Sequence, residues 1–137
     1  MPELNFTPEQ RAAIDTRGSA VLVSAAAGSG KTRVLTERLM AYLTDAETPV
    51  DIDRFLVITY TRAAAAELRS RILDGIYARI ASDPENRRLR RQAALCAHAE
   101  IGTIHSFCAD FLRANCAALA LAPDFQVADT ERCIALR

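Results

Sequence analysis

A short loop of small residues, 25–32, constrains most strongly how this chain can fold. Its sequence is Ala-Ala-Ala-Gly-Ser-Gly-Lys-Thr, and it directly follows the apolar run 20–24, which is typical of a buried parallel strand. A helix is expected from about Lys31 to Leu43. A glycine-lysine-threonine string between a strand and a helix predicts a loop that wraps around phosphate groups, rather than an ordinary glycine-rich turn.

Each residue type in this loop suits phosphate binding. Several backbone N–H groups must approach the phosphate oxygens closely, and Gly28 and Gly30 allow a tight turn that a side chain would block. Lys31 is predicted to reach the β- and γ-phosphates of ATP, and the Thr32 hydroxyl is predicted to bind Mg²⁺. The predicted nucleotide-binding residues of the loop are Ala27, Gly28, Ser29, Gly30, Lys31 and Thr32.

Composition supports this role for Lys31 and excludes other classes of protein. The chain has sixteen arginines and one lysine, so the lysine that remains stands where a compact ammonium group is needed. A hydrophobic content of 50% excludes disordered and fibrous classes. No apolar run approaches the roughly 20 residues of a membrane-spanning helix. The first residues lack a secretory signal, so a cytoplasmic protein without membrane contact is expected.

The charges and cysteines are less specific. The net charge is zero, but nine of the seventeen basic residues lie between Arg54 and Arg91. The basic stretch 87–91 could follow a phosphate backbone, although a solvated helix face is the simpler interpretation. The cysteines form no C-x-x-C pair and are expected to be reduced core thiols rather than metal ligands. They are Cys96, Cys108, Cys116 and Cys133.

The remaining pattern predicts alternating helices and strands. Thr7 is expected to cap a first helix that has Pro8 at its start, Gln10 as the partner in a capping box and Gly18 after its end. The elements expected after the loop helix are a buried strand at 55–60, a helix from Ala63 with an apolar stripe of Ala64, Leu68, Ile72, Ile76 and Ile80, a helix at 85–97, an extended piece at 100–103 and a helix at 105–119. This order predicts an α/β fold whose parallel sheet is covered on both faces, with ligands at the carboxyl ends of the strands.

Residues 6–10, with the sequence Phe-Thr-Pro-Glu-Gln, resemble the Q motif of superfamily 1 DNA helicases of the UvrD, Rep and RecB kind. The resemblance implies that the Gln10 amide pairs with the complementary edge of adenine. The capping box is the alternative role, and both can hold if Thr7 alone caps the backbone. Arg33, just after the phosphate loop, resembles a UvrD arginine that lies against adenine.

Residues 58–68 resemble motif Ia of these helicases, which borders the channel for single-stranded DNA. Tyr60 offers a ring on which a base can stack, and Thr61 and Arg62 at a helix start can hold phosphates. Family members often have asparagine at the position of Arg62. Without the resemblance, an ordinary strand-to-helix turn would be the favoured interpretation.

Residues 101–108 resemble motif Ib, a second DNA-contacting segment at a strand-to-helix junction. Thr103, His105 and Ser106 can donate to phosphate oxygens. A helix-capping role for Thr103 or Ser106 is the alternative.

The resemblance implies a P-loop NTPase with a RecA-like three-layer fold. Residues 1–137 would be the amino-terminal part of a UvrD-like ATP-binding domain, an incomplete fragment of motor domain 1A. Residues 24–32, 50–54 and 63–66 look most like the AddA branch, the large subunits of bacterial helicase–nucleases that process double-strand breaks for recombinational repair. The implied partners are DNA and an AddB-like protein, and an exonuclease is implied in the parent protein.

Some parts of such a motor are not found in this sequence. No strand ending in the Asp-Glu pair of a Walker B motif follows, and Thr130 looks like the cap of a helix at Glu131 that the chain does not complete. A fragment that binds ATP and Mg²⁺ without turning over is therefore expected. The alternatives are a UvrD/Rep-type repair helicase without nuclease, a P-loop small-molecule kinase and a non-catalytic nucleotide-binding module.

Overall fold

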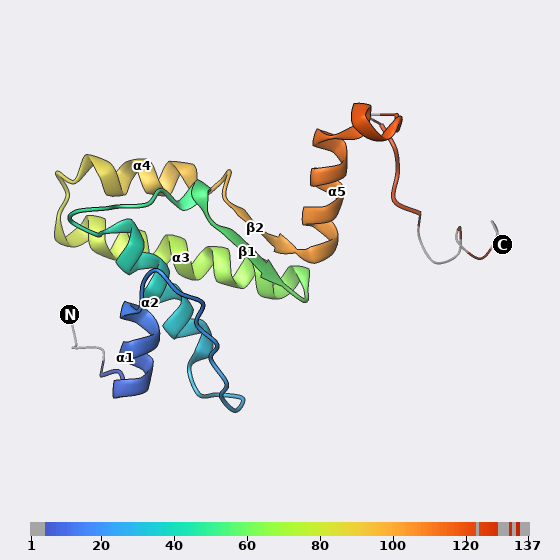
Figure 1. Ribbon diagram of the computed structural model, residues 1–137. Coiled ribbons are helices and arrows are strands. Elements are labelled where there is room, and N and C mark those ends of the chain that lie inside the picture. The colour runs from blue at the N-terminus through green and yellow to red at the C-terminus, as the bar shows by residue number, and fades with distance from the viewer. Residues whose placement is uncertain (1–4, 123, 129–131, 133, 135–137) are drawn as a thin grey trace.

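The computed structural model describes residues 5–122, 124–128, 132 and 134. Helices and two short strands alternate along them, as Figure 1 shows. In order, the elements are α1 (Pro8–Asp15), α2 (Lys31–Leu43), the 3₁₀ turn η1 (Ile52–Arg54), β1 (Leu56–Thr59), α3 (Arg62–Ser82), α4 (Arg87–Leu95), β2 (Glu100–Thr103), α5 (Ile104–Ala114) and the 3₁₀ turn η2 (Cys116–Leu119). The cap predicted at Thr130 and the helix predicted at Glu131 lie outside the described residues.

The start of helix α1 confirms the predicted capping box. The Thr7 hydroxyl oxygen accepts from the Gln10 backbone N–H at 3.3 Å, and the Thr7 backbone N–H donates to Gln10 Oε1 at 3.0 Å. Pro8 occupies the first helical position, where no backbone donor is needed. The helix ends at Asp15, and Gly18 follows in the left-handed conformation with φ +70°. Local sequence alone therefore determines this element.

The two strands form a parallel pair, as predicted. Leu56 lies opposite Glu100 at one end and Thr59 opposite Thr103 at the other. Helices α3 and α4 connect the strands, which is the long crossover that a parallel pair requires. The carboxyl ends of both strands consequently lie side by side, and each leads into the start of a helix (Figure 1).

The core lies between helices α2 and α3 and one face of the strand pair. Its buried side chains are Leu39, Met40, Leu43, Ile52, Val57, Leu68, Ile72, Ile76, Cys96, Ala99 and Ile101. Three of the residues predicted in the α3 stripe, Leu68, Ile72 and Ile76, are in this cluster. Ala64 is exposed, and the neighbouring Ala65 is buried in its place.

The predicted strand at 20–24 is wrong for this structure. The segment is extended but pairs with no described strand, and Leu22 is 95% exposed. The strand predicted at 55–60 is also less buried than expected, because Leu56 and Ile58 are 50% and 45% exposed while only Val57 is buried. Apolar runs of this kind become buried strands only where another strand and a covering layer meet them. Among the described residues, neither meets segment 20–24, and the face of β1 that bears Leu56 and Ile58 stays open.

The helices differ from the prediction mainly at their ends. The helix expected at 105–119 is interrupted at Asn115, whose side-chain amide donates to the Phe111 carbonyl at 2.8 Å, and it continues only as η2. An asparagine that bonds the preceding turn in this way competes with the helical backbone. Within the described residues, no helix combines the length and apolar character that crossing a membrane requires.

Candidate functional site

The phosphate-loop sequence folds into a turn that ends at a helix start without a side-chain cap. Gly28 and Gly30 have φ values of +77° and +83°, a region in which side chains other than glycine are strained. Gly30 is the N-cap of α2 and makes no side-chain capping bond. The first N–H groups of α2 therefore lack the capping oxygen that most helices supply, and they carry the positive end of the helix dipole. This arrangement suits an anionic ligand.

Lys31 folds back over the loop. Its ammonium group donates to the carbonyl oxygens of Ala25 and Ala26, both at 2.7 Å. The side chain is exposed, as are those of the other predicted loop residues Ala27, Ser29 and Thr32. An ammonium group has three donors, so Lys31 retains one donor for an incoming oxygen. The donors of the loop and the exposed Thr32 hydroxyl fit the phosphate groups of ATP and a bound Mg²⁺.

Gln10 joins helix α1 to the phosphate loop. Its amide nitrogen donates to the Ser29 carbonyl oxygen at 3.1 Å, while its amide oxygen accepts from the Thr7 N–H. The capping box is therefore complete, and the condition that Thr7 alone caps the backbone is not met. An amide group still offers a second N–H and a second lone pair after these two bonds. Gln10, Ser29 and Lys31 line one groove between α1 and the extended segment 20–24.

Arg33 lies against Phe6 of the same segment as Gln10. Its guanidinium carbon is 4.7 Å from the centre of the Phe6 ring, and that of Arg11 is 5.3 Å from the same ring. Both distances are within the range of cation–π attraction. The structure thus brings together Phe6, Gln10 and Arg33, the residues assigned to adenine by resemblance. Sequence reasoning did not identify Arg11 as the second cation on this ring.

The motif Ia residues surround the start of helix α3. The Thr61 hydroxyl oxygen accepts from the Ala64 N–H at 3.1 Å and caps the helix, so this side chain already has a structural role. Tyr60 is 100% exposed, and Arg62 is exposed at the first helical position. The ring and the guanidinium are consequently open to a ligand.

The motif Ib residues form a second capping box at the start of α5. Thr103 Oγ1 accepts from the Ser106 N–H at 3.2 Å, and Ser106 Oγ accepts from the Thr103 N–H at 2.9 Å. The capping role considered from sequence is therefore present, and His105 is the exposed residue between them. Sequence reasoning missed the role of Gly102: a Cβ atom there would lie 2.6 Å from Ser106 Oγ.

The exposed residues of motifs Ia and Ib line one groove. From the predicted set, Tyr60, Arg62, Thr103, His105 and Ser106 contribute to its walls. The carboxyl ends of β1 and β2 bring them together because Thr59 and Thr103 are partners in register. The walls also contain Arg113 and Phe125, which were not predicted; the Arg113 guanidinium lies 5.5 Å from the Phe125 ring centre and pairs with Asp110 at 2.8 Å. Arg113 follows His105 by about two helical turns, a spacing that could have indicated it.

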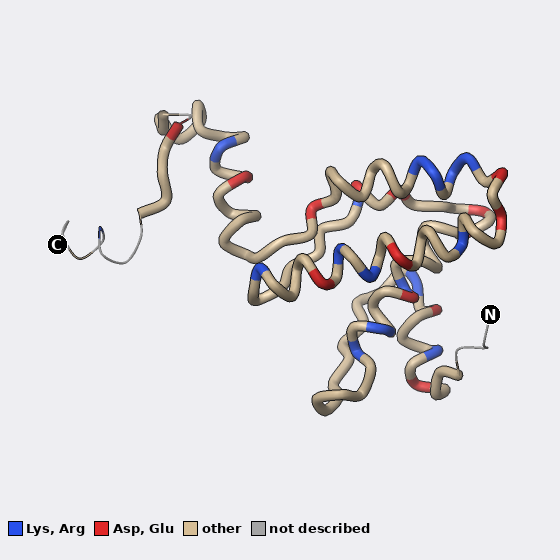
Figure 2. Tube along the Cα trace, turned by 180° about the vertical axis from the view of Figure 1, so that it is seen from behind, with Lys and Arg blue, Asp and Glu red and all other residues tan. Residues whose placement is uncertain are grey.

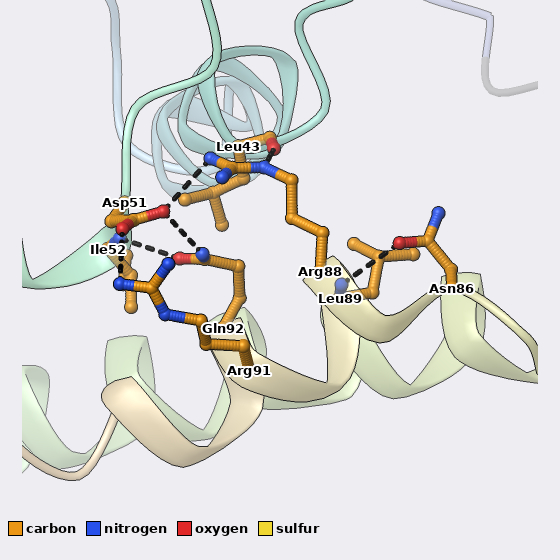
Figure 3. Close-up of polar contacts among 8 residues, drawn as sticks. All are labelled: Leu43, Asp51, Ile52, Asn86, Arg88, Leu89, Arg91 and Gln92. Atoms are coloured by element: carbon orange, nitrogen blue, oxygen red, sulfur yellow. Dashed lines mark hydrogen bonds and ion pairs between the residues drawn. The ribbon is translucent and has the colours of Figure 1, made fainter.

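The basic stretch 87–91 lies elsewhere, at the amino end of α4 and away from this groove (Figure 2). Arg88 and Arg91 pair with the carboxylate of Asp51 at 3.0 and 3.1 Å. Gln92 is completely buried; it donates to Asp51 at 2.7 Å and accepts from the Ile52 N–H at 2.8 Å (Figure 3). This network, which sequence reasoning missed, holds α4 against η1. At least two of the arginines therefore have structural partners, which favours the simpler interpretation of the stretch.

The described cysteines are free thiols. Burial raises the pKa of the Cys96 thiol, and the nearby Arg69 guanidinium opposes this effect. Arg69 also donates to the carbonyl oxygens of Ala99 and Ile101 at 3.1 and 3.0 Å, so it supports the chain that enters β2. Over the described part of the chain, no three histidine, cysteine or acidic side chains gather as a metal-binding group.

Comparison with known proteins gives consistent relatives. AddA proteins, named for their place in an ATP-dependent helicase/nuclease, from Clostridium acetobutylicum, Pelotomaculum thermopropionicum and Clostridium novyi are 50%, 52% and 46% identical to this chain over 133, 124 and 137 residues. The matches cover 97%, 90% and 100% of this chain but only 11%, 10% and 11% of those proteins. The chain thus spans about a tenth of the length of the curated relatives it matches.

A family model described as the UvrD/REP helicase N-terminal domain matches residues 6–136, which is nearly the whole sequence. The match includes all the motifs on which the resemblance was based, and it confirms that resemblance. The chain therefore belongs to the UvrD/REP helicase N-terminal domain family.

Proposed function

We propose that this chain is the ATP-binding part of a DNA helicase motor domain, and that residues 1–137 form the first part of a RecA-like domain 1A with a P-loop. Family membership supports this assignment. The parallel strands and the uncapped start of α2 after the glycine loop are compatible with it.

In the proposed nucleotide site, the chain's own groups bind and orient ATP. Lys31 exchanges its bonds to the Ala25 and Ala26 carbonyls for oxygens of the β- and γ-phosphates, while Thr32 offers its hydroxyl to Mg²⁺. Backbone N–H groups of residues 27–30 surround the phosphates. Gln10 uses its remaining amide donor and acceptor on the adenine edge, and Arg33 contributes a flat cation beside it.

The observation that carries the DNA-binding part of the proposal is the groove shared by Tyr60, Arg62 and His105. Single-stranded DNA requires aromatic surfaces for its bases and cations or donors for its phosphates. Tyr60 offers such a surface, and Arg62 and His105 offer donors at two adjacent helix starts. Thr61, Thr103 and Ser106 add their backbone N–H groups, since their hydroxyls serve as caps.

The activity of the whole protein is part of the same proposal. The relatives are named as parts of an ATP-dependent helicase/nuclease, and this chain would belong to a cytoplasmic protein of that kind. That protein would couple ATP hydrolysis to translocation on single-stranded DNA and to unwinding, in double-strand break repair and recombination. Its partners would be DNA and an AddB-like protein, and it would also contain an exonuclease.

Calorimetric titration with ATP and Mg²⁺ tests the nucleotide site directly. The chain should bind, Lys31→Ala should lose binding, and Arg87→Ala should match the unaltered chain because it removes an equal charge from an exposed position on α4. A single-stranded oligonucleotide should alter the affinity for ATP. Equal binding by the chain and by Lys31→Ala would exclude the proposed site.

A further inference from the structure

The carboxyl end of helix α1 is held by an arginine from helix α2. The Arg38 guanidinium donates to the carbonyl oxygens of Ala13 and Ile14, and its other nitrogen donates to the Tyr42 hydroxyl at 3.3 Å. The last carbonyls of a helix have no partner within that helix, so an arginine fork that reaches them satisfies otherwise unpaired acceptors. Arg38 thereby connects α1 to the helix that begins at Lys31.

A second arginine supports this connection. The Arg17 guanidinium lies 4.0 Å above the centre of the Tyr42 ring and donates to the Ile14 carbonyl at 2.6 Å. Arg38 lies 5.4 Å from the same ring, and the other neighbour of Tyr42 is Phe55, whose ring centre is 5.5 Å away. Phe55 packs against the core. The end of α1 is therefore fixed to the core through Tyr42, and not only to the surface of α2.

The amino end of α1 has its own attachment, the bond from Gln10 to the Ser29 carbonyl. Gln10 and Ala13 are three residues apart, or about 5 Å along the helix axis. A helix of eight residues that is held at both ends cannot tilt without displacing Gln10 from the phosphate loop. The two attachments thus determine together where the Gln10 amide lies relative to the loop.

We propose that Arg38 is a positioning residue for recognition of the nucleotide base. It holds α1, and with it Gln10, at the distance from the phosphate loop at which the amide can contact the base while Lys31 contacts the phosphates. Arg38 itself does not touch the nucleotide. This inference rests on the proposed function, because it requires that Gln10 reads adenine.

The test compares three ligands that share the phosphate groups, namely ATP, GTP and tripolyphosphate, each titrated calorimetrically with Mg²⁺. Arg38→Met keeps most of the length of the side chain and removes its donors. It should reduce the preference for ATP over GTP about fivefold, the equivalent of one hydrogen bond, and leave tripolyphosphate affinity unchanged. Arg38→Lys should restore part of the preference. Arg71→Met, which removes an exposed cation paired with Glu67 on α3, is the matched control and should change none of the three affinities.

Three results would overturn the inference. An unchanged preference in Arg38→Met would show that the base is read without this anchor, and an equal loss for all three ligands would show a general loss of structure. If Arg38→Met fails to fold, Arg17→Met weakens the same anchor from its exposed side, and an unchanged preference in that variant would overturn the inference equally. Failure of the proposed function gives a different pattern, in which the unaltered chain binds none of the ligands or Lys31→Ala binds them all normally.

Discussion

The ammonium group of Lys31 lies 2.7 Å from the carbonyl oxygen of Ala25, the first residue of its own loop. A compact ammonium can make this contact within a tight turn, whereas a planar guanidinium needs more room and bonds in a fixed fork. Lys31→Arg should therefore reduce ATP affinity at least tenfold although it keeps the charge, and it should leave thermal stability unchanged because the side chain is exposed. Calorimetry with parallel thermal melts measures both. Retention of full affinity would mean that charge alone is required.

Exposure of the Tyr60 ring leads to a prediction for DNA binding. Tyr60→Ala should weaken binding of a labelled single-stranded oligonucleotide by about 1–3 kcal/mol, because it removes a stacking surface. Tyr60→Phe should retain most of the affinity. Tyr77→Ala, at a position 57% exposed on α3, is the control for loss of an exposed tyrosine. Fluorescence anisotropy measures the affinities, and equal values for Tyr60→Ala and Tyr77→Ala would exclude Tyr60 from the DNA site.

Crowding between Gly102 and Ser106 leads to a prediction for stability. A Cβ atom on Gly102 would lie 2.6 Å from Ser106 Oγ, which is too close for two unbonded atoms. Gly102→Ala should reduce the free energy of unfolding by about 1–3 kcal/mol. Ser106→Ala removes the crowding atom but also one bond of the capping box, at a cost of about 1 kcal/mol. The double variant should lose less than the sum of the two single losses in urea denaturation; strict additivity would contradict the predicted contact.

Burial of Cys96 leads to a prediction for pH dependence. Because burial raises the pKa of this thiol above its ordinary value, the folded state favours the protonated form. The resulting stabilisation is fully present below the pKa of the unfolded chain and is lost as the pH rises through the higher folded value. The free energy of unfolding should therefore decrease in the alkaline range, and Cys96→Val should reduce that decrease.

Reagent access gives an independent measure of the same burial. A thiol reagent should label the exposed Cys108 rapidly in the folded chain and label Cys96 only after denaturation, as peptide mass spectrometry can resolve. Rapid labelling of Cys96 under native conditions would contradict its position in the core.

The position of segment 20–24 can be tested with two leucines. Leu22 is 95% exposed and Leu43 is completely buried in the core. Leu43→Ala should cost about 2–5 kcal/mol of stability because it leaves a cavity, whereas Leu22→Ala should change stability by less than about 0.5 kcal/mol. Urea denaturation of this chain compares the two variants. A large loss in Leu22→Ala would show that the segment is packed as a buried strand after all.

Features that depend on neighbouring residues could be predicted from the sequence alone. The capping box of Thr7 and Gln10, the glycine turn before Lys31 and the α3 stripe of Leu68, Ile72 and Ile76 all follow from spacings within a few turns of the chain. The parallel strand pair followed from the order of elements, since a helical connection between two strands requires it. The motifs in this order also predicted the family correctly.

The tertiary structure decided the features that require distant segments to meet. Residues 20–24 have the composition of a buried strand, but no described strand lies beside them, and burial depends on that neighbour and not on composition. Gln10 bonds the Ser29 carbonyl and Arg38 bonds the carbonyl of Ala13 because α1 packs on α2, which no local pattern encodes. Local sequence thus determined which elements form, while their packing determined which groups are capped, anchored or left open to a ligand.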